Sequence, residues 1–187
     1  MRNIEPEKPH GGTFLEEVID ASGVDIRACY QCRKCSAGCP VVSAMDIIPN
    51  QVIRQIQYER REKVLTCGSI WICASCHTCS VRCPNDIDFA HVMDALRHIA
   101  LRSGIGVGEP SIPVFHKAFL DSIKGTGRIH ELSLILRYKL KTRDFLKDAG
   151  LGWQMFRRGK IKVLPQGFTG GKEVREIFNA YERGAAK

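Results

Sequence analysis

The sequence has few aromatic residues and no long apolar run. Phenylalanine, tyrosine and tryptophan together make up 7% of its 187 residues. No stretch approaches the roughly 20 consecutive apolar residues that a membrane-spanning helix needs, so we expect no membrane span. The first ten residues are mostly polar and hold no apolar segment of the kind found in secretory signals. We therefore expect a soluble protein of the cytoplasm.

Recognisable catalytic and nucleotide-binding patterns are also missing. The glycine-rich stretch at 104–108 follows no predicted strand and lacks the spacing of a dinucleotide-binding loop. No Ser-His-Asp or Cys-His pattern of a nucleophilic enzyme stands out, and no two cysteines are adjacent. The chain is therefore predicted to have no catalytic residues of its own, so that a substrate site would have to come from another protein of the same complex.

The positive charge of the chain is unevenly distributed. The formal net charge is +8, and the whole excess falls on residues 105–187, because residues 1–104 carry equal numbers of acidic and basic side chains. Two interpretations of the basic half stay open: a docking surface for an acidic partner, or an ordinary solvated face. Since no helix-turn-helix, zinc-finger or aromatic-basic motif is present, we predict no binding of nucleic acid.

Cysteine is the residue that the sequence has in excess, and eight of the nine cysteines lie in two runs. Both runs have the spacing C-x2-C-x2-C-x3-C-P, which is typical of proteins that bind a pair of [4Fe–4S] clusters. Three closely spaced cysteines on a loop reach three iron corners of one cluster, and the fourth, before proline, ligates the other cluster. The two runs are Cys29, Cys32, Cys35 and Cys39, and Cys73, Cys76, Cys79 and Cys83.

Crossed ligation of this kind predicts two ligand sets, each with three thiolates from one run and one from the other. The first cluster is predicted to be bound by Cys29, Cys32, Cys35 and Cys83. The second cluster is predicted to be bound by Cys73, Cys76, Cys79 and Cys39. Two clusters held so close together would relay electrons between them.

Other roles for the cysteines are less consistent with the pattern. Zinc sites usually pair two C-x2-C knuckles, whereas each run here has four cysteines and a proline. The odd number of cysteines and the lack of a secretory signal disfavour a disulfide framework. Cys67 stands outside both runs and is either a buried thiol or an additional redox thiol or ligand. His77, inside the second run, either tunes a nearby cluster or lies on the surface.

Apolar residues recur at helical spacing along most of the chain, so we predict an all-α fold. Residues 1–12 are expected to be a flexible lead. Residues 13–104 are expected to form an α-helical ferredoxin domain with both clusters, and residues 105–187 a basic helical C-terminal extension for docking to other subunits. No internal repeat is expected beyond the two cysteine runs.

Capping signals locate three helices of the cluster domain. The first is expected to begin at Thr13, with Glu16 completing a capping box, and to end at Gly23. The second is expected to begin at Pro49 and to continue through Glu59 and Lys63, spaced to pair on one face. The third follows Asp88 and ends at Gly104. In the extension we expect helices around 114–123, 132–140 and 174–181, and a short extended segment at 159–165.

Two such cysteine runs, separated by a helical insert and followed by a basic helical tail, resemble the α-helical ferredoxin family. Within it, the chain is most similar to the C subunits of the soluble heterodisulfide reductases of methanogenic archaea. The similarity rests on the size of the chain and on the segments 45–50 and 158–165. It is expected to extend over most of the chain.

This resemblance implies an electron-transfer component of an oxidoreductase rather than a catalytic one. In such complexes the A subunit, which contains flavin and iron–sulfur clusters, would bifurcate electrons and supply them. The B subunit, which contains noncubane clusters, would receive them and reduce the CoM-S-S-CoB heterodisulfide of methanogenesis. A hydrogenase would join the larger complex.

Other members of the family offer an alternative role. These are the iron–sulfur subunits of fumarate or succinate reductases and of anaerobic glycerol-3-phosphate dehydrogenases. Fumarate reductase subunits usually carry a [2Fe–2S] motif first, and none precedes Cys29. Two alternatives belong to a different class of protein: a zinc-dependent scaffold or a basic nucleic-acid adaptor. A protein that binds zinc and contains no acid-labile sulfide would favour them.

Overall fold

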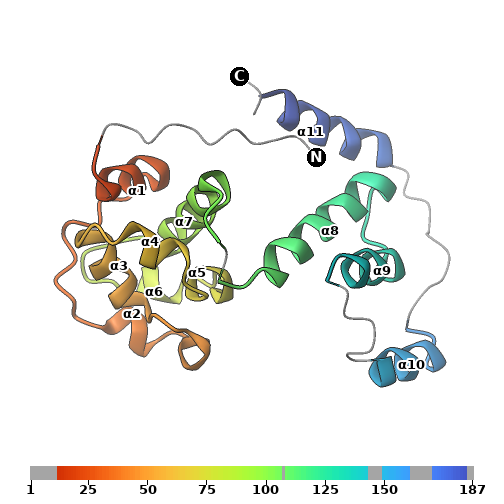
Figure 1. The fold of residues 1–187 in the computed structure, drawn as a ribbon, viewed down its shortest axis with the longest axis horizontal. Helices are drawn as coiled ribbons and strands as arrows, with labels where there is room; N and C mark the ends of the chain where they lie inside the picture. The colour runs from red at the N-terminus through yellow and green to blue at the C-terminus, as the bar shows by residue number, and fades with distance from the viewer. Residues whose placement is uncertain (1–11, 107, 143–148, 161–169, 185–187) are drawn as a thin grey trace. The chain divides into compact units, whose positions relative to one another are not determined.

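The computed structural model describes residues 12–106, 108–142, 149–160 and 170–184 (Figure 1). The described residues form helices and no strand, which confirms the predicted all-α class. They divide into two compact units, Met1–Pro110 and Ser111–Lys187. Residues 1–11 and 161–165, expected as part of a flexible lead and of an extended segment, lie outside the described residues. The domain limits inferred from the sequence stay a prediction.

The first unit is built around one long helix, α7. The helices of this unit are α1 (Phe14–Ser22), α2 (Lys34–Ala37), a 3-10 turn η1 (Val42–Ala44), α3 (Pro49–Gln57), α4 (Arg61–Leu65), α5 (Ser69–Ile72), α6 (Thr78–Val81) and α7 (Phe89–Ser103). Helix α7 contacts α1, α4, α5 and α6. Its apolar stripe is buried, so its packing determines where the shorter helices lie.

The core of this unit explains why α3 and α7 form helices. Each has apolar residues at helical spacing on one face and polar residues on the other. Among the buried residues of these two faces are Val52, Ile53 and Ile56 in α3 and Val92, Met93 and Leu96 in α7, none of them more than 3% exposed. Asp88 caps α7 by accepting a hydrogen bond from the Ala90 backbone N–H, and Gly104 ends it, as predicted.

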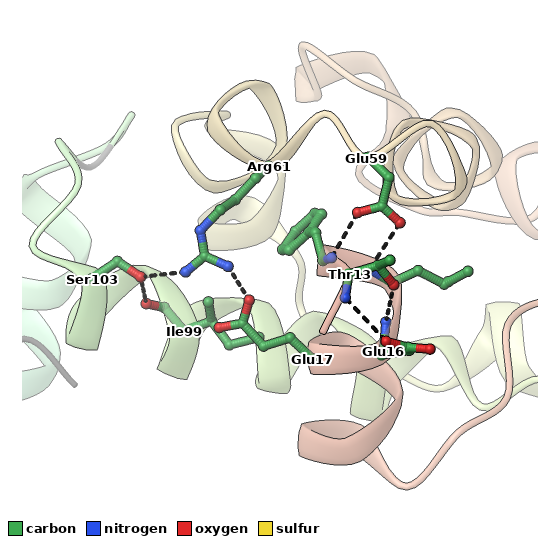
Figure 2. A network of polar contacts seen from close by, with 9 residues as sticks. Thr13, Glu16, Glu17, Glu59, Arg61, Ile99 and Ser103 are labelled. Carbon is green, nitrogen blue, oxygen red and sulfur yellow. Dashed lines mark hydrogen bonds and ion pairs between the residues drawn. The ribbon is translucent and has the colours of Figure 1, made fainter. Parts of the chain in front are cut away.

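Helix α1 is held by hydrogen bonds at its N-terminus, which Figure 2 shows. Thr13 and Glu16 form the predicted capping box. In addition, the backbone N–H of Phe14 donates to Glu59 Oε2 at 2.6 Å, and that of Leu15 donates to Glu59 Oε1 at 3.3 Å. A carboxylate from a distant part of the chain therefore satisfies two amides that no helical carbonyl can reach.

Arg61 continues this network to helix α7. Its guanidinium pairs with Glu17 of α1 and donates a hydrogen bond to Ser103 Oγ at 2.8 Å (Figure 2). Ser103 Oγ in turn donates to the Ile99 carbonyl at 2.7 Å. The network thus ties α1, α4 and α7 together at one end of the unit.

The prediction of one helix running from Pro49 through Lys63 is wrong. Helix α3 ends at Gln57, α4 begins at Arg61, and Glu59 between them has a left-handed φ of 57°. The break turns the Glu59 carboxylate toward α1. A pair with Lys63 on a helix surface would contribute only about 0.2–0.5 kcal/mol, whereas a helix cap contributes about 1 kcal/mol.

We expect Glu59→Ala to lower the free energy of unfolding by about 1–2 kcal/mol, because two N-terminal amides of α1 lose their acceptor. Denaturant titration monitored by helical circular dichroism measures the change. Glu62→Ala, an exposed carboxylate on the neighbouring helix, is the matched control. Equal stability of the two variants would contradict the role of Glu59 as a cap.

The second unit has a much smaller buried core. Its helices are α8 (Ser111–Thr126), α9 (Glu131–Thr142), α10 (Ala149–Arg157) and α11 (Gly171–Gly184). Helix α8 contacts α9 and α11, and Ala118 and Leu134 are buried there. The three helices expected in this part are confirmed, and α10 is additional. No helix in the described parts of the chain is long and apolar enough to cross a membrane.

Candidate metal centre

The two cysteine runs fold into the same loop. In each run, the residue before the second cysteine and the residue after it have left-handed backbone conformations, which curl the loop. These residues are Gln31 (φ 64°) and Arg33 (φ 65°) in the first run and Ser75 (φ 48°) and His77 (φ 57°) in the second. A four-residue helix, α2 or α6, then carries the third cysteine.

Each loop lines a hollow. The cysteines around the first hollow are Cys29, Cys32, Cys35, Cys79 and Cys83. Those around the second hollow are Cys39, Cys73, Cys76 and Cys79. Each hollow therefore has three thiols from one run and at least one from the other. Cysteine thiolates are the ligands of [4Fe–4S] clusters, so this donor set fits the predicted group.

Contacts between the runs bring the distant thiols together. Helix α2 contacts α6. The side-chain amide of Asn85, just after the second run, donates a hydrogen bond to the Ala28 carbonyl, just before the first run. This contact places the end of one run beside the start of the other, and so places Cys83 at the first hollow.

One aromatic side chain lines both hollows. Phe89, the first residue of α7, is 2% exposed and contributes to the walls of both. Cys79 also lines both. The two hollows are therefore neighbours with an apolar side chain between them, which excludes water from this region.

A serine after the third cysteine ties each loop to the helix that follows. Ser36 Oγ accepts a hydrogen bond from the Asn50 backbone N–H at 3.0 Å, and Ser80 Oγ accepts one from the Ala90 N–H at 3.5 Å. Asn50 and Ala90 are the second residues of α3 and α7. A helix N-terminus favours anions, so both helices begin where thiolate-bound clusters would carry negative charge.

A hydrogen-bond chain reaches one sulfur of the first run. Gln31 Nε2 donates to Cys29 Sγ at 3.3 Å, and its Oε1 accepts from Asn50 Nδ2 at 3.0 Å. Ser36 Oγ donates to Asn50 Oδ1 at 2.7 Å. Hydrogen bonds to cluster sulfurs tune reduction potentials. Sequence reasoning missed these residues; the serine repeated after the third cysteine was the available signal.

The second run has a carboxylate instead of this amide chain. Asp88 Oδ1 accepts from Ser80 Oγ at 2.6 Å, and Asp88 Oδ2 lies 2.7 Å from His91 Nδ1. The hydrogen bond from Ser80, with those from His91, lowers the pKa of Asp88 to about 2. His77 lines the second hollow, and half of its side chain is exposed. An effect of His77 on a cluster stays a prediction.

Cys67 is 4% exposed and is not among the residues that line either hollow. Burial raises the pKa of its thiol. Asp46 accepts hydrogen bonds from the backbone N–H groups of Gly68 and Ser69, both at 2.9 Å, and thereby caps α5 beside it. The structure thus describes Cys67 as a buried thiol of the packed core.

The correspondence between the two halves extends beyond the cysteine runs, which the sequence pattern did not predict. The loops 26–40 and 70–84 correspond, and so do the helical segments 49–57 and 89–97. In this alignment the buried residues Val52, Ile53 and Ile56 of α3 correspond to Val92, Met93 and Leu96 of α7. The first unit therefore contains an internal repeat of loop and helix, with one hollow beside each loop.

A known protein family matches the part of the chain that contains both cysteine loops. Residues 28–88 match the family described as 4Fe-4S dicluster domain. This segment contains both cysteine runs and the helices between them. The chain is therefore an iron–sulfur protein with two [4Fe–4S] clusters.

Curated relatives show which iron–sulfur proteins the chain is similar to. The chain is 35% identical over 99 residues to the C2 iron–sulfur subunit of the CoB–CoM heterodisulfide reductase of Methanocaldococcus jannaschii, covering 49% of this chain and 53% of the relative. It is 32% identical over 90 residues to the C subunit of the ferredoxin:CoB-CoM heterodisulfide reductase of Methanosarcina mazei, covering 48% and 55%. The predicted resemblance to the C subunits of heterodisulfide reductases is confirmed.

The extent of the similarity is narrower than expected. The chain spans about half the length of the curated relatives it matches, and the matched segments make up about half of this chain. The dicluster family itself ends at residue 88, before the second unit begins.

Proposed function

We propose that the chain is the electron-transfer subunit of a heterodisulfide reductase, an oxidoreductase complex. The observation that carries this proposal is the pair of adjacent cysteine-lined hollows, in a chain related to C subunits of such enzymes. Electrons would enter from an A subunit that contains flavin and iron–sulfur clusters and would cross the two centres. They would leave to a B subunit that reduces the CoM-S-S-CoB heterodisulfide.

The crossed ligand sets are part of this proposal. The second hollow has four thiols among the described residues, so a cluster there needs every one of them, Cys79 included. The four that remain around the first hollow are Cys29, Cys32, Cys35 and Cys83. The sets that the motif predicts are thus the sets that give each hollow four thiolates.

The chain's own residues supply insulation and position. When bound, each [4Fe–4S] cluster accepts and returns one electron. Phe89 fills the space between the hollows and excludes water, and the loops hold the thiolates in fixed positions through Ser36 and Ser80. We place the complex in the cytoplasm, where thiols are kept reduced.

The second unit is proposed as a docking surface for the partner subunits. It carries basic residues of α9 and α10 together with exposed apolar side chains of α10: Leu151, Trp153, Met155 and Phe156. Exposed aromatic residues beside arginines are enriched in protein interfaces. Loaded clusters on the partner subunits would add negative charge to them.

We expect the double change Arg157→Glu and Arg158→Glu to weaken binding to the partner subunits roughly tenfold at low salt, because it reverses charge beside the apolar face of α10. Binding kinetics over a range of salt concentrations measure this loss. The control makes the same charge change in the first unit, at the exposed Arg60 and Lys63. Weakening by the control alone would move the docking surface to the first unit.

Anaerobic purification of the native complex tests the function itself. A cysteine-rich flavoprotein that co-purifies with a chain containing paired-cysteine motifs, together with iron and acid-labile sulfide in this chain, would support the heterodisulfide reductase proposal. A flavin dehydrogenase with a [2Fe–2S] partner would assign the chain to the fumarate reductase or glycerol-3-phosphate dehydrogenase type. Zinc without sulfide would contradict both.

A further inference from the structure

Two side chains at equivalent positions of the repeat hold the two cysteine loops. In the first half, Gln57 Nε2 of α3 donates hydrogen bonds to the carbonyls of Ile26 and Cys29, at 3.1 and 3.5 Å. In the second half, Arg97 of α7 donates to the carbonyls of Ile70 and Cys73, both at 2.5 Å. Each side chain therefore donates hydrogen bonds to the carbonyl of the first cysteine of a run and to that of the residue three positions before it. We call Gln57 and Arg97 the two clamps.

The two clamps differ in charge. Gln57 is a neutral amide, whereas Arg97 is a guanidinium that keeps its proton at any physiological pH. The Arg97 side chain is only 16% exposed, and it also donates to Ser75 Oγ, the residue before Cys76, at 3.2 Å. The charge of Arg97 is thus largely shielded from solvent and is held against the loop that carries Cys73 and Cys76, two thiols of the second hollow.

Other charges near the two loops lie farther out or in water. Asp94 pairs with Arg97 at 2.8 Å, but half of its side chain is exposed, so solvent screens it more strongly. Arg54 occupies the position in the first half that Asp94 occupies in the second. Its guanidinium donates a hydrogen bond to Gln57 Oε1 at 3.3 Å rather than to the cysteine loop. Arg33 lines the first hollow from the exposed surface. His77 lines the second hollow, and its Nδ1 lies 3.7 Å from Asp88 Oδ1, so the Asp88 carboxylate offsets the charge that a protonated His77 would carry.

We propose that the positive charge of Arg97 raises the reduction potential of the second cluster above the value that a neutral clamp would give it. Reduction adds a negative charge to a cluster, and a nearby cation in a low-dielectric setting stabilises that added charge. Arg97 is a positioning residue that acts through the loop of Cys73. This inference rests on the proposed ligand sets.

Exchange of the two clamps tests the proposal. In Arg97→Gln, potentiometric titration followed by electron paramagnetic resonance should show the second cluster shifted to more negative potential and the first unmoved. We expect the reduced-to-oxidised ratio of the second cluster to fall about tenfold at a fixed potential, which is about 59 mV for a one-electron couple. Arg97→Lys keeps the charge and should keep most of the potential. Cys76→Ser identifies the signal that belongs to the second cluster.

The reciprocal variant, Gln57→Arg, tests the same effect of charge at the first cluster. Gln57→Arg should shift the first cluster to more positive potential in a protein whose second clamp is intact. If Arg97→Gln does not retain its second cluster, the Gln57→Arg result alone decides. Normal iron and sulfide with unmoved potentials in the variants would overturn the role of Arg97 and leave the proposed function standing. Absence of clusters from the unaltered protein would contradict the proposed function itself.

Discussion

Replacing Cys39 with alanine should remove the second cluster and leave the first. Cys39 belongs to the first run, yet it lines the second hollow beside Cys73, Cys76 and Cys79. Without it, the second hollow has only three thiols among the described residues, and a cubane cluster there loses an iron ligand. The loss should therefore appear in the cluster held by the other run.

Iron and sulfide content measure the effect, which should fall from about eight of each per chain to about four. Mössbauer or electron paramagnetic resonance spectra of the reduced protein then show which signal has gone. Cys67→Ala is the matched control, since Cys67 lines neither hollow, and it should keep both clusters. Selective loss of the first cluster in Cys39→Ala would show that each run binds its own cluster.

Replacing Phe89 with alanine should destabilise the first unit by about 3–5 kcal/mol, because a buried aromatic ring is lost and a cavity remains. Phe89 also lines both hollows, so the cavity opens at a place that touches both clusters. Water entering there should speed the loss of both clusters on heating or in air.

The midpoint of anaerobic thermal bleaching of the cluster absorbance measures this change. Phe89→Leu fills much of the same space and should show a smaller decrease. Val81→Ala removes a side chain that is 87% exposed on α6, next to the same site, and should leave the midpoint unchanged. If Phe89→Ala matched Val81→Ala, the ring would have no role in separating or protecting the hollows.

Local signals in the sequence predicted much of the fold. The capping box at Thr13, the proline at Pro49 and the cap at Asp88 mark helix starts through contacts within one turn, so sequence alone reveals them. The spacing of the cysteines predicted the loops for the same reason. Gly23 and Gly104 have left-handed φ values at the helix ends where they were expected.

Contacts between distant residues could not be predicted in this way. Glu59 looked like one member of a helix surface pair, and only the packing of α1 reveals it as a cap. Gln57 and Arg97 lie on amphipathic helices, and their equivalence emerges only when both loops are folded. Helix α10 was missed because it contains Gly150 and Gly152, and glycine inside a helix is unfavourable.

The crossing of thiols between the two runs also has a consequence for biosynthesis. Domains fold from their N-terminal end as the chain leaves the ribosome, but neither hollow has four thiols from its own run. In the proposed ligand sets, the second cluster gains its last thiolate when Cys79 emerges, and the first only when Cys83 follows. With these sets, cofactor insertion would have to wait for nearly the whole unit, and the ligand set of the earlier run would be completed last.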